Sequence, residues 1–194
     1  MTLQDEFIKC YRGEWTTIGH LQFRLEGRIL YFQCTRGEKD TKSNLNFKWV
    51  YYNGMYVHAG FLAMWLAARE VILSLDFDEV RGYSQGGVFA SLTTLEYKRK
   101  IICIVFGCPR FLWMPKRVHR DTHIIRIENP WDWITKLPFA ILGYRHIGKR
   151  IRLKNRGGKP SHIHLLYWLT GHSENMYSQN LEGLLCYQDK LIRD

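Results

Sequence analysis

Residues 79–91 read EVRGYSQGGVFAS and contain the pattern G-x-S-x-G. The apolar and polar pattern predicts a short strand over 79–83 and a helix over 85–98. A serine on a sharp strand-to-helix turn needs small flanking residues, because larger side chains would clash there. This context makes Ser84 a candidate nucleophile, and a glycine-rich turn of purely structural use is the alternative.

The segments on both sides of this turn alternate between strand and helix patterns. The predicted strands cover 29–35, 101–107 and 122–127, and the predicted helices cover 61–75 and 171–188. Such alternation is typical of an α/β fold with a mostly parallel central sheet flanked by helices. No composition shift divides the chain, so we expect a single domain over residues 1–194.

The composition excludes several classes of protein. The chain has 194 residues, of which 46% are hydrophobic, so a disordered, collagen-like or disulfide-framework protein is excluded. Five cysteines without framework spacing indicate reduced thiols. No signal peptide or membrane-spanning stretch is visible, and we therefore expect a cytoplasmic location. Cys103 and Cys108 lack a second Cys/His pair, so no metal and no cofactor is predicted.

The chain is strongly basic, with 28 Lys and Arg against 18 Asp and Glu and a net charge of +10. Many of these cations lie in a strand-and-turn region over 148–160: Lys149, Arg150, Arg152, Lys154, Arg156 and Lys159. This region is either a solvated face or a surface that docks on anionic membranes. No nucleic-acid-binding motif is present, so no nucleic acid partner is expected, and no pattern predicts an oligomeric state.

A serine nucleophile needs a base and an acid, which in this architecture follow in the order serine, acid, histidine. Asp132 stands just beyond a predicted strand, where a triad acid belongs. His172 follows Gly171 at the start of the last predicted helix, where a loop leads into it. By spacing alone, His146 remains a rival for the base. His162 and His164 alternate in an apolar run and are interpreted as structural or surface groups.

Several segments resemble the class 3, fungal-type lipase family of the α/β-hydrolase superfamily, in the same order along the chain. They span residues 29–177 and comprise VHAGF (57–61), GYSQGG (82–87), FGCPR (106–110), NPWDWITKLP (129–138), GYRHIG (143–148) and His172-Ser173 with Tyr177. Six ordered blocks are far more specific than the serine motif alone.

The resemblance implies an α/β-hydrolase fold with a catalytic triad of Ser84, Asp132 and His172, and it assigns His146 to a structural block. FQCT (32–35) is similar to the family pattern F-R-G-[ST], which implies that Thr35 and the backbone N–H of Gln85 form the oxyanion hole.

Two departures from the family pattern matter. Phe111-Leu112-Trp113-Met114 follows Arg110 where the family has a Gly-Asn pair, and its Leu-Trp-Met part either packs internally or faces lipid or substrate. The stretch 36–46 is short and charged, which predicts a minimal lid and weak interfacial activation.

The sequence therefore predicts a serine-dependent carboxylic-ester hydrolase, either a lipase or an esterase, whose partner is an ester or lipid substrate. A phospholipase A1-like acyl hydrolase on anionic membranes is the first alternative. A non-catalytic basic binding protein on a hydrolase fold is the second.

Overall fold

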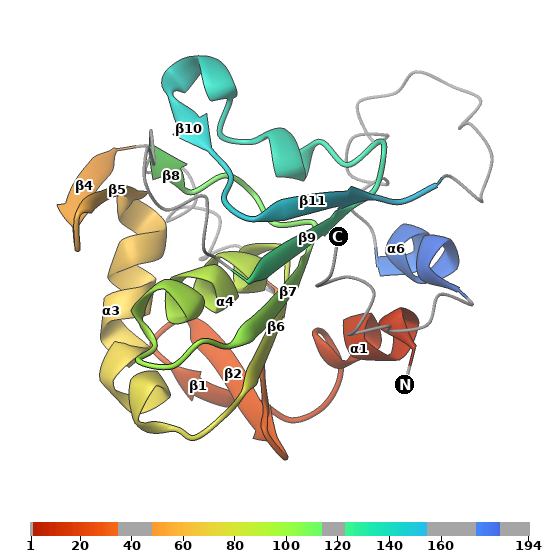
Figure 1. The fold of residues 1–194 in the computed structure, drawn as a ribbon, viewed down its shortest axis with the longest axis horizontal. Coiled ribbons are helices and arrows are strands. Elements are labelled where there is room, and N and C mark those ends of the chain that lie inside the picture. Colours follow the sequence, from red (N-terminus) through yellow and green to blue (C-terminus); the bar gives the residue numbers. More distant parts are fainter. Residues whose placement is uncertain (1, 35–47, 114–122, 155–173, 183–194) are drawn as a thin grey trace.

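The computed structural model describes residues 2–34, 48–113, 123–154 and 174–182. Figure 1 shows a central sheet with helices on both of its faces. Among the described residues, none of the helices combines the length and the apolar character that crossing a membrane requires.

The central sheet has seven strands in the order β1-β2-β3-β6-β7-β9-β11. Their bounds are β1 Thr16–Ile18, β2 Leu21–Glu26, β3 Ile29–Phe32, β6 Glu79–Tyr83, β7 Ile102–Phe106, β9 Ile124–Glu128 and β11 Lys149–Arg152. The five strands from β3 to β11 run parallel, whereas β1 and β2 join the edge antiparallel. The mixed α/β fold with a mostly parallel sheet is confirmed, and the antiparallel edge is an addition that the sequence analysis did not predict.

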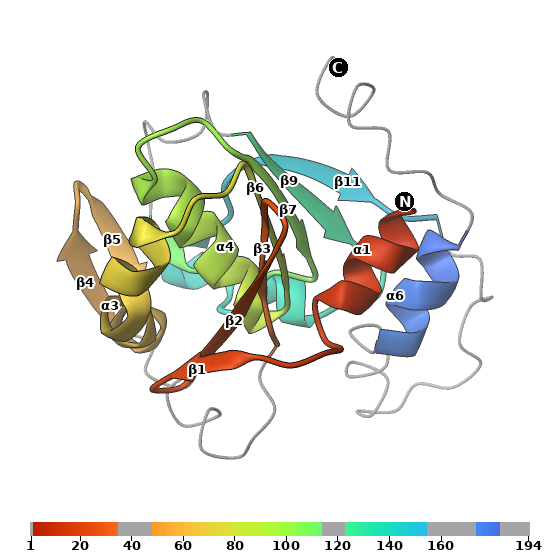
Figure 2. The ribbon, with the colours of Figure 1, turned by 90° about the horizontal axis from the view of Figure 1, so that it is seen from below.

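The helices form two layers that enclose the sheet (Figure 2). On one face, α3 (Ala59–Ser74) and α4 (Gln85–Glu96) share a core with the sheet, and Trp65, Val80 and Val105 are fully buried there. On the other face, α1 (Leu3–Lys9) and α6 (Glu174–Leu181) enclose a second core that includes Phe7 and Tyr177. Burial on both faces explains why the β7 sequence is apolar throughout.

The predicted elements agree with the structure except at their ends. Strand β3 stops at Phe32, and β9 is shifted toward Glu128. Helix α4 ends at Glu96 because Tyr97 adopts an extended conformation. In α3, which the sequence predicts over 61–75, Leu66 and Val71 are exposed. The predicted helix over 171–188 is observed as α6 (Glu174–Leu181), and Glu182 lies in a turn. Residues 171–173 and 183–188 lie outside the described part of the chain.

A second, four-stranded sheet has the order β10-β8-β5-β4. Its strands are β4 Trp49–Tyr52, β5 Met55–His58, β8 Leu112–Trp113 and β10 Tyr144–Arg145. The turn between β4 and β5 has positive φ at both Asn53 and Gly54 (46° and 81°), which is the geometry that Asn-Gly favours in a hairpin. The 3₁₀ helices η1 (Ile134–Lys136) and η2 (Ala140–Leu142) lead from β9 into this sheet.

Candidate active site

Ser84 lies at the turn between β6 and α4. Its φ of 56° and ψ of −125° put a non-glycine residue in a strained backbone conformation. Its backbone N–H donates to the carbonyl of Phe106 on the neighbouring strand at 2.9 Å, and its own carbonyl accepts from Gly87 at 3.0 Å. The predicted strand–turn–helix context of this serine is therefore present, and the strain is maintained by bonds on both sides.

Two glycines make the sharp turn possible. A Cβ atom at Gly82 would lie 2.3 Å from the carbonyl oxygen of Gly86, and a Cβ at Gly86 would lie 2.4 Å from the carbonyl oxygen of Phe32. Neither neighbour can move away easily, because both are backbone atoms. The start of α4 packs closely against β6 and β3, and this close contact requires glycine at both positions of the G-x-S-x-G pattern.

Gln85 is the first residue of α4, so its backbone N–H belongs to the positive end of the helix. Its side chain is buried and its amide Nε2 lies 3.4 Å from the sulfur of Met64. The side chain therefore packs in the core, and only its backbone is available for a role beside Ser84.

Asp132 lies four residues beyond the end of β9 and is completely buried. Its Oδ1 accepts hydrogen bonds from the backbone N–H groups of Ile134 at 2.9 Å and Thr135 at 3.4 Å. Its Oδ2 accepts from the hydroxyl of Tyr177 at 2.6 Å. These donors hold the carboxylate in one orientation and offset the cost of burying it.

Tyr177 connects this acid to the serine turn. Its hydroxyl also accepts from the backbone N–H of Asn129 at 3.1 Å, and its ring packs edge-on against Tyr83 with the centroids 5.7 Å apart. Burial and the neighbouring Asp132 raise the pKa of the Tyr177 phenol well above its usual range, so the hydroxyl stays protonated and donates. In the sequence, Tyr177 stands out only as part of the motif that includes His172, and nothing there indicates this role.

Asn180 fixes the same helix to the acid segment. Its side-chain amide donates to Oδ1 of Asn129 at 2.9 Å. Tyr177 and Asn180 are three residues apart and lie on one face of α6, so both can reach the segment after β9. The spacing of two buried polar residues on a helix was the only sequence signal for this contact.

The strand order brings Ser84 and Asp132 to the same edge of the sheet. Ser84 follows β6, Asp132 follows β9, and β7 lies between these two strands. With strands spaced about 4.8 Å apart, the ends of β6 and β9 are roughly 10 Å apart. Crevices at the carboxyl ends of parallel strands are the usual ligand sites of such sheets.

Two other predicted site residues, Thr35 and His172, lie outside the described residues, as does the predicted minimal lid over 36–46. The structure therefore brings Ser84, Gln85 and Asp132 to one edge of the sheet and leaves the roles of Thr35 and His172 as predictions. Helix α6 begins two residues after His172.

His146, the rival base, contacts the acid segment from another side. Its Nε2 lies 2.6 Å from the carbonyl oxygen of Thr135, and burial followed by the nearby Arg126 lowers the pKa of His146 to about 3. A neutral imidazole whose Nε2–H donates to a backbone carbonyl stabilises local structure. This arrangement agrees with the structural role that the resemblance implies.

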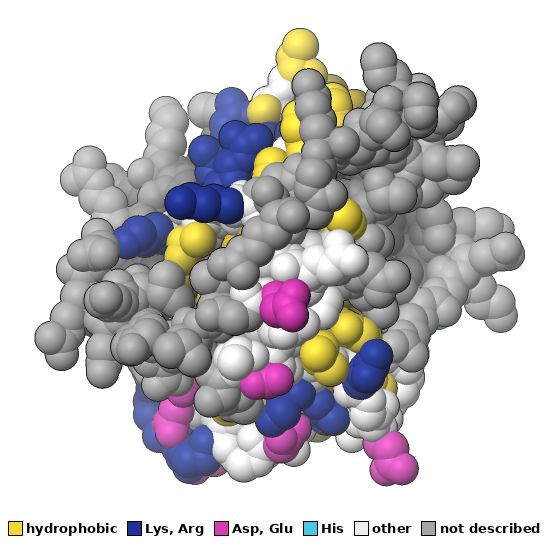
Figure 3. Space-filling view, turned by 90° about the vertical axis from the view of Figure 1, so that its right-hand side faces the viewer, with side chains coloured by type: hydrophobic (Ala, Val, Ile, Leu, Met, Phe, Trp, Pro, Cys, Tyr) yellow, Lys and Arg dark blue, Asp and Glu magenta, His cyan; other side chains and the backbone are white. Residues whose placement is uncertain are grey.

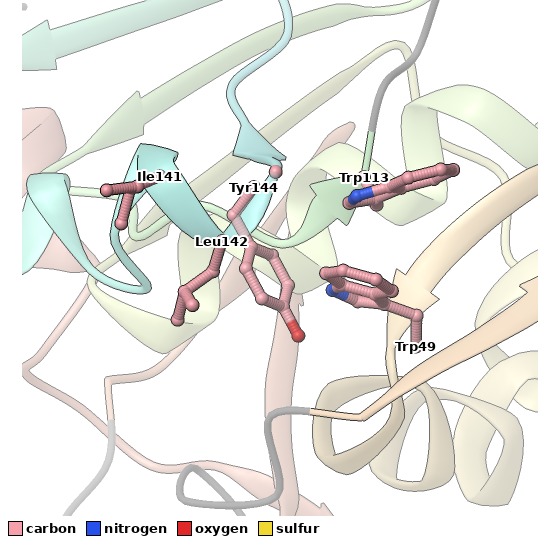
Figure 4. Close-up of a pocket in the computed structure, with 6 residues that line it drawn as sticks. Trp49, Trp113, Ile141, Leu142 and Tyr144 are labelled. Carbon is pink, nitrogen blue, oxygen red and sulfur yellow. The ribbon is translucent and has the colours of Figure 1, made fainter.

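Leu112 of the Leu-Trp-Met segment is fully buried, while Trp113 is half-buried and Met114 lies outside the described residues. Trp113 and Trp49 lie with their rings 5.0 Å apart at one side of an apolar pocket (Figure 4). The pocket has a volume of about 470 Å³, and Ile141, Leu142 and Tyr144 line the rest of it. Packing accounts for Leu112, and the exposed apolar surface belongs to the neighbouring residues.

No family model and no curated protein matches the chain. Solved structures of fungal lipases do match it. The native Rhizomucor miehei lipase propeptide complex superposes with a TM-score of 0.59 and 22% identity over 72% of this chain and 55% of that chain. A lipase from Rhizopus microsporus var. chinensis gives 0.54 and 22%, over 68% and 56%.

A third structure, a fungal lipase–inhibitor complex, gives a TM-score of 0.58 and 20% identity over 75% of this chain and 67% of that chain. The chain thus spans little more than half the length of the first two lipases. At such identities the likeness concerns the fold alone, and the central sheet with its flanking helices is similar to that of fungal lipases.

Proposed function

We propose that the protein is a serine carboxylic-ester hydrolase, a lipase or esterase, with Ser84 as the nucleophile. The observation that carries this proposal is the backbone of Ser84, which is strained, held by Phe106 and Gly87, and set at the start of α4. Strain of this kind is maintained only where the surrounding structure enforces it, and it concentrates at functional sites.

In the proposed reaction, the Ser84 hydroxyl attacks the ester carbonyl while His172 accepts its proton. His172 then returns the proton to the leaving alcohol, and an acyl-enzyme remains on Ser84. Water activated by His172 attacks this acyl group and releases the acid. The backbone N–H of Gln85 and the Thr35 hydroxyl stabilise the oxyanion of each tetrahedral intermediate.

Asp132 orients His172 and stabilises its charged form in this scheme. Its fixed carboxylate supports the role, because an acid that orients a histidine must itself be held in place. The roughly 10 Å that separates the ends of β6 and β9 leaves room for an imidazole between serine and acid. His172 precedes α6, the helix whose Tyr177 contacts Asp132, which also supports its choice as base.

An ester with an apolar acyl part is the substrate class that the surface favours. The apolar pocket of Figure 4 is lined by the exposed side chains of Trp49, Ile141 and Leu142, of which Ile141 is 93% exposed. Exposed apolar groups gathered on one surface are typical of contact with lipid or with a protein partner.

A phospholipase A1-like activity on anionic membranes is the second candidate. The exposed basic side chains of β11, Lys149, Arg150 and Arg152, favour it, since such groups attract acidic lipid surfaces. Arg156 and Lys159 of the same basic region lie outside the described residues. The non-catalytic alternative predicts binding to anionic surfaces without ester turnover.

A panel of esters from p-nitrophenyl acetate to long-chain triglycerides and phospholipids tests these candidates together. We expect the wild type to hydrolyse at least one class and Ser84→Ala to hydrolyse none. Ser74→Ala is the matched control, because Ser74 lies at the exposed end of α3 and bonds only to the carbonyl of Val71. If the wild type and Ser84→Ala hydrolyse the panel equally, the proposed function is wrong.

A further inference from the structure

Strands β9 and β11 carry charged side chains on one face of the central sheet. This is the face against which α4 packs at other strands. The parallel register of β9 and β11 sets Arg126 opposite Arg150, and the next pair on this face sets Glu128 opposite Arg152. The alternate positions, such as Ile127, are apolar and pack in the core beneath α1 and α6. Two cations opposite each other on one sheet face destabilise it unless an anion compensates them.

These side chains line a cavity of about 320 Å³, which we name the arginine cavity. Arg110 and Lys136 add two further cations to its wall, and Asp132 and His146 also line it. Five cationic groups therefore face the two carboxylates of Glu128 and Asp132. The Asp132 carboxylate accepts hydrogen bonds from Tyr177 and the backbone, so Glu128 is the principal compensating anion for these cations.

Arg126 is the buried member of this set, with only 8% of its surface exposed. One of its terminal nitrogens pairs with Glu128, but its Nε is buried and has no hydrogen-bond partner among the described residues. The Nδ1 of His146 is likewise buried, and no partner for it lies in the part of the chain that the structure describes. Buried polar groups in this state are costly, because each has lost its bonds to water and gained none in return.

The charge balance around Arg126 is incomplete as well. Burial lowers the pKa of Arg126 and raises the pKa of Glu128. The attraction between the two side chains therefore offsets only part of the cost of burying their charges. A second anion in the cavity would compensate the charge of Arg126 and reduce the repulsion between Arg126 and Arg150. Lys and Arg side chains also gather on the upper left of the molecular face in Figure 3, which would attract anions from solution.

We propose that the arginine cavity is a binding site for a phosphate group, either free or as a phosphate ester. Guanidinium groups match the geometry of phosphate oxygens and bind them in a bidentate manner. A phosphate fills only part of the volume and leaves room for a small organic substituent. Asp132, the proposed catalytic acid, lies in the wall of this cavity. Phosphate binding needs no ester chemistry at Ser84, however, so a binding measurement tests the site separately from the proposed hydrolase activity.

Calorimetric titration of the full chain with inorganic phosphate at constant ionic strength tests this proposal. We expect saturable binding that weakens at least tenfold in Arg150→Gln, because one charge-assisted contact to the anion is lost. Lys149→Gln is the matched control: it removes the same charge from the neighbouring position of β11, on the opposite face. We expect Lys149→Gln to change the affinity by less than twofold.

Glu128→Gln gives a test in the opposite direction. Removal of this carboxylate leaves Arg126 without its present counter-ion, so phosphate binding should become tighter. Absence of saturable phosphate binding in the wild type would overturn the proposal, as would equal weakening in Arg150→Gln and Lys149→Gln.

The source of the phosphate is distinguished by two further titrations. If the protein binds glycerol 3-phosphate but does not bind vesicles of phosphatidylcholine and phosphatidic acid, the ligand is a soluble phosphate ester. Binding to those vesicles that inorganic phosphate displaces, and that Arg150→Gln loses, indicates a lipid headgroup. Either result supports the phosphate site, and failure of both probes to bind would contradict it.

Discussion

Replacement of Tyr177 by phenylalanine removes one hydroxyl and keeps the ring. The hydroxyl donates to Asp132 Oδ2 at 2.6 Å and accepts from the Asn129 N–H at 3.1 Å. Loss of a bond to a charged acceptor costs about 1.5–3 kcal/mol, and an unsatisfied buried N–H adds about 1–3 kcal/mol. Since phenylalanine preserves the packing against Tyr83, we expect a loss of about 3–4 kcal/mol in the free energy of unfolding.

The same change should lower kcat on p-nitrophenyl butyrate about tenfold and leave KM unchanged, because a carboxylate with one orienting donor fewer holds the base less well. Urea unfolding and initial-rate kinetics measure the two effects. Tyr97→Phe is the matched control, since the Tyr97 hydroxyl donates to the carbonyl of Leu75 and accepts from the N–H of Phe77. That control loses two hydrogen bonds of neutral groups, so it should lose about 1–3 kcal/mol of stability and keep its kcat.

A kcat for Tyr177→Phe within twofold of the wild type, measured where both proteins are folded, would refute the role given to Tyr177. Equal kcat losses in Tyr177→Phe and Tyr97→Phe would refute it as well, because they would point to general destabilisation.

The remaining predictions concern packing and pH. Gly86→Ala should destabilise the fold by about 3 kcal/mol or more, since its Cβ would lie 2.4 Å from the Phe32 oxygen; unchanged thermal unfolding would contradict this. His146, whose pKa is lowered to about 3, should make stability fall as the pH drops below about 6.5, by up to about 1.4 kcal/mol per pH unit. Urea titrations from pH 7 to 4 should therefore show a smaller slope for His146→Gln. Arg28 lowers the pKa values of Asp76 and Asp78, so its contribution should be present at pH 7 and lost as acid protonates these carboxylates. The stability difference between the wild type and Arg28→Gln should vanish at acid pH, and a difference that persists there would count against the ion pairs.

The turn at Ser84 could be predicted from the sequence because its signal is local. Strand β6, the glycines and α4 are consecutive, and the glycines are required by contacts within this unit and with β3. The apolar run of β7 likewise reveals a strand covered on both faces. The apolar and polar pattern of each of these elements is visible within its own residues. The sequence therefore predicts the parallel sheet.

The contacts that fix Asp132 could not be predicted in the same way. Tyr177 is 45 residues away from Asp132 in the sequence, and nothing local to either residue encodes their hydrogen bond. The second sheet was missed because β8 and β10 have two residues each, too few to show any periodicity. Its hairpin turn at Asn53-Gly54 did carry a recognisable signal.

The arginine cavity went unrecognised because it contradicts the usual polarity pattern of strands. Arg126 and Glu128 alternate with isoleucine in β9, which suggests one solvated face, yet both charged side chains are buried. Only the register with β11 and the segment after β9 reveals that they line a cavity. Sequence patterns that seem to describe a surface can therefore belong to a binding cavity.

The most direct test of the central claim is covalent labelling of the full chain with a fluorophosphonate probe, followed by peptide mass spectrometry. A fluorophosphonate reacts with a serine only when a base activates it. We predict one adduct per chain, located on Ser84, absent in Ser84→Ala and retained in Ser74→Ala. A wild-type protein that remains unlabelled, or an adduct on another residue that persists in Ser84→Ala, would contradict the assignment of Ser84 as the nucleophile.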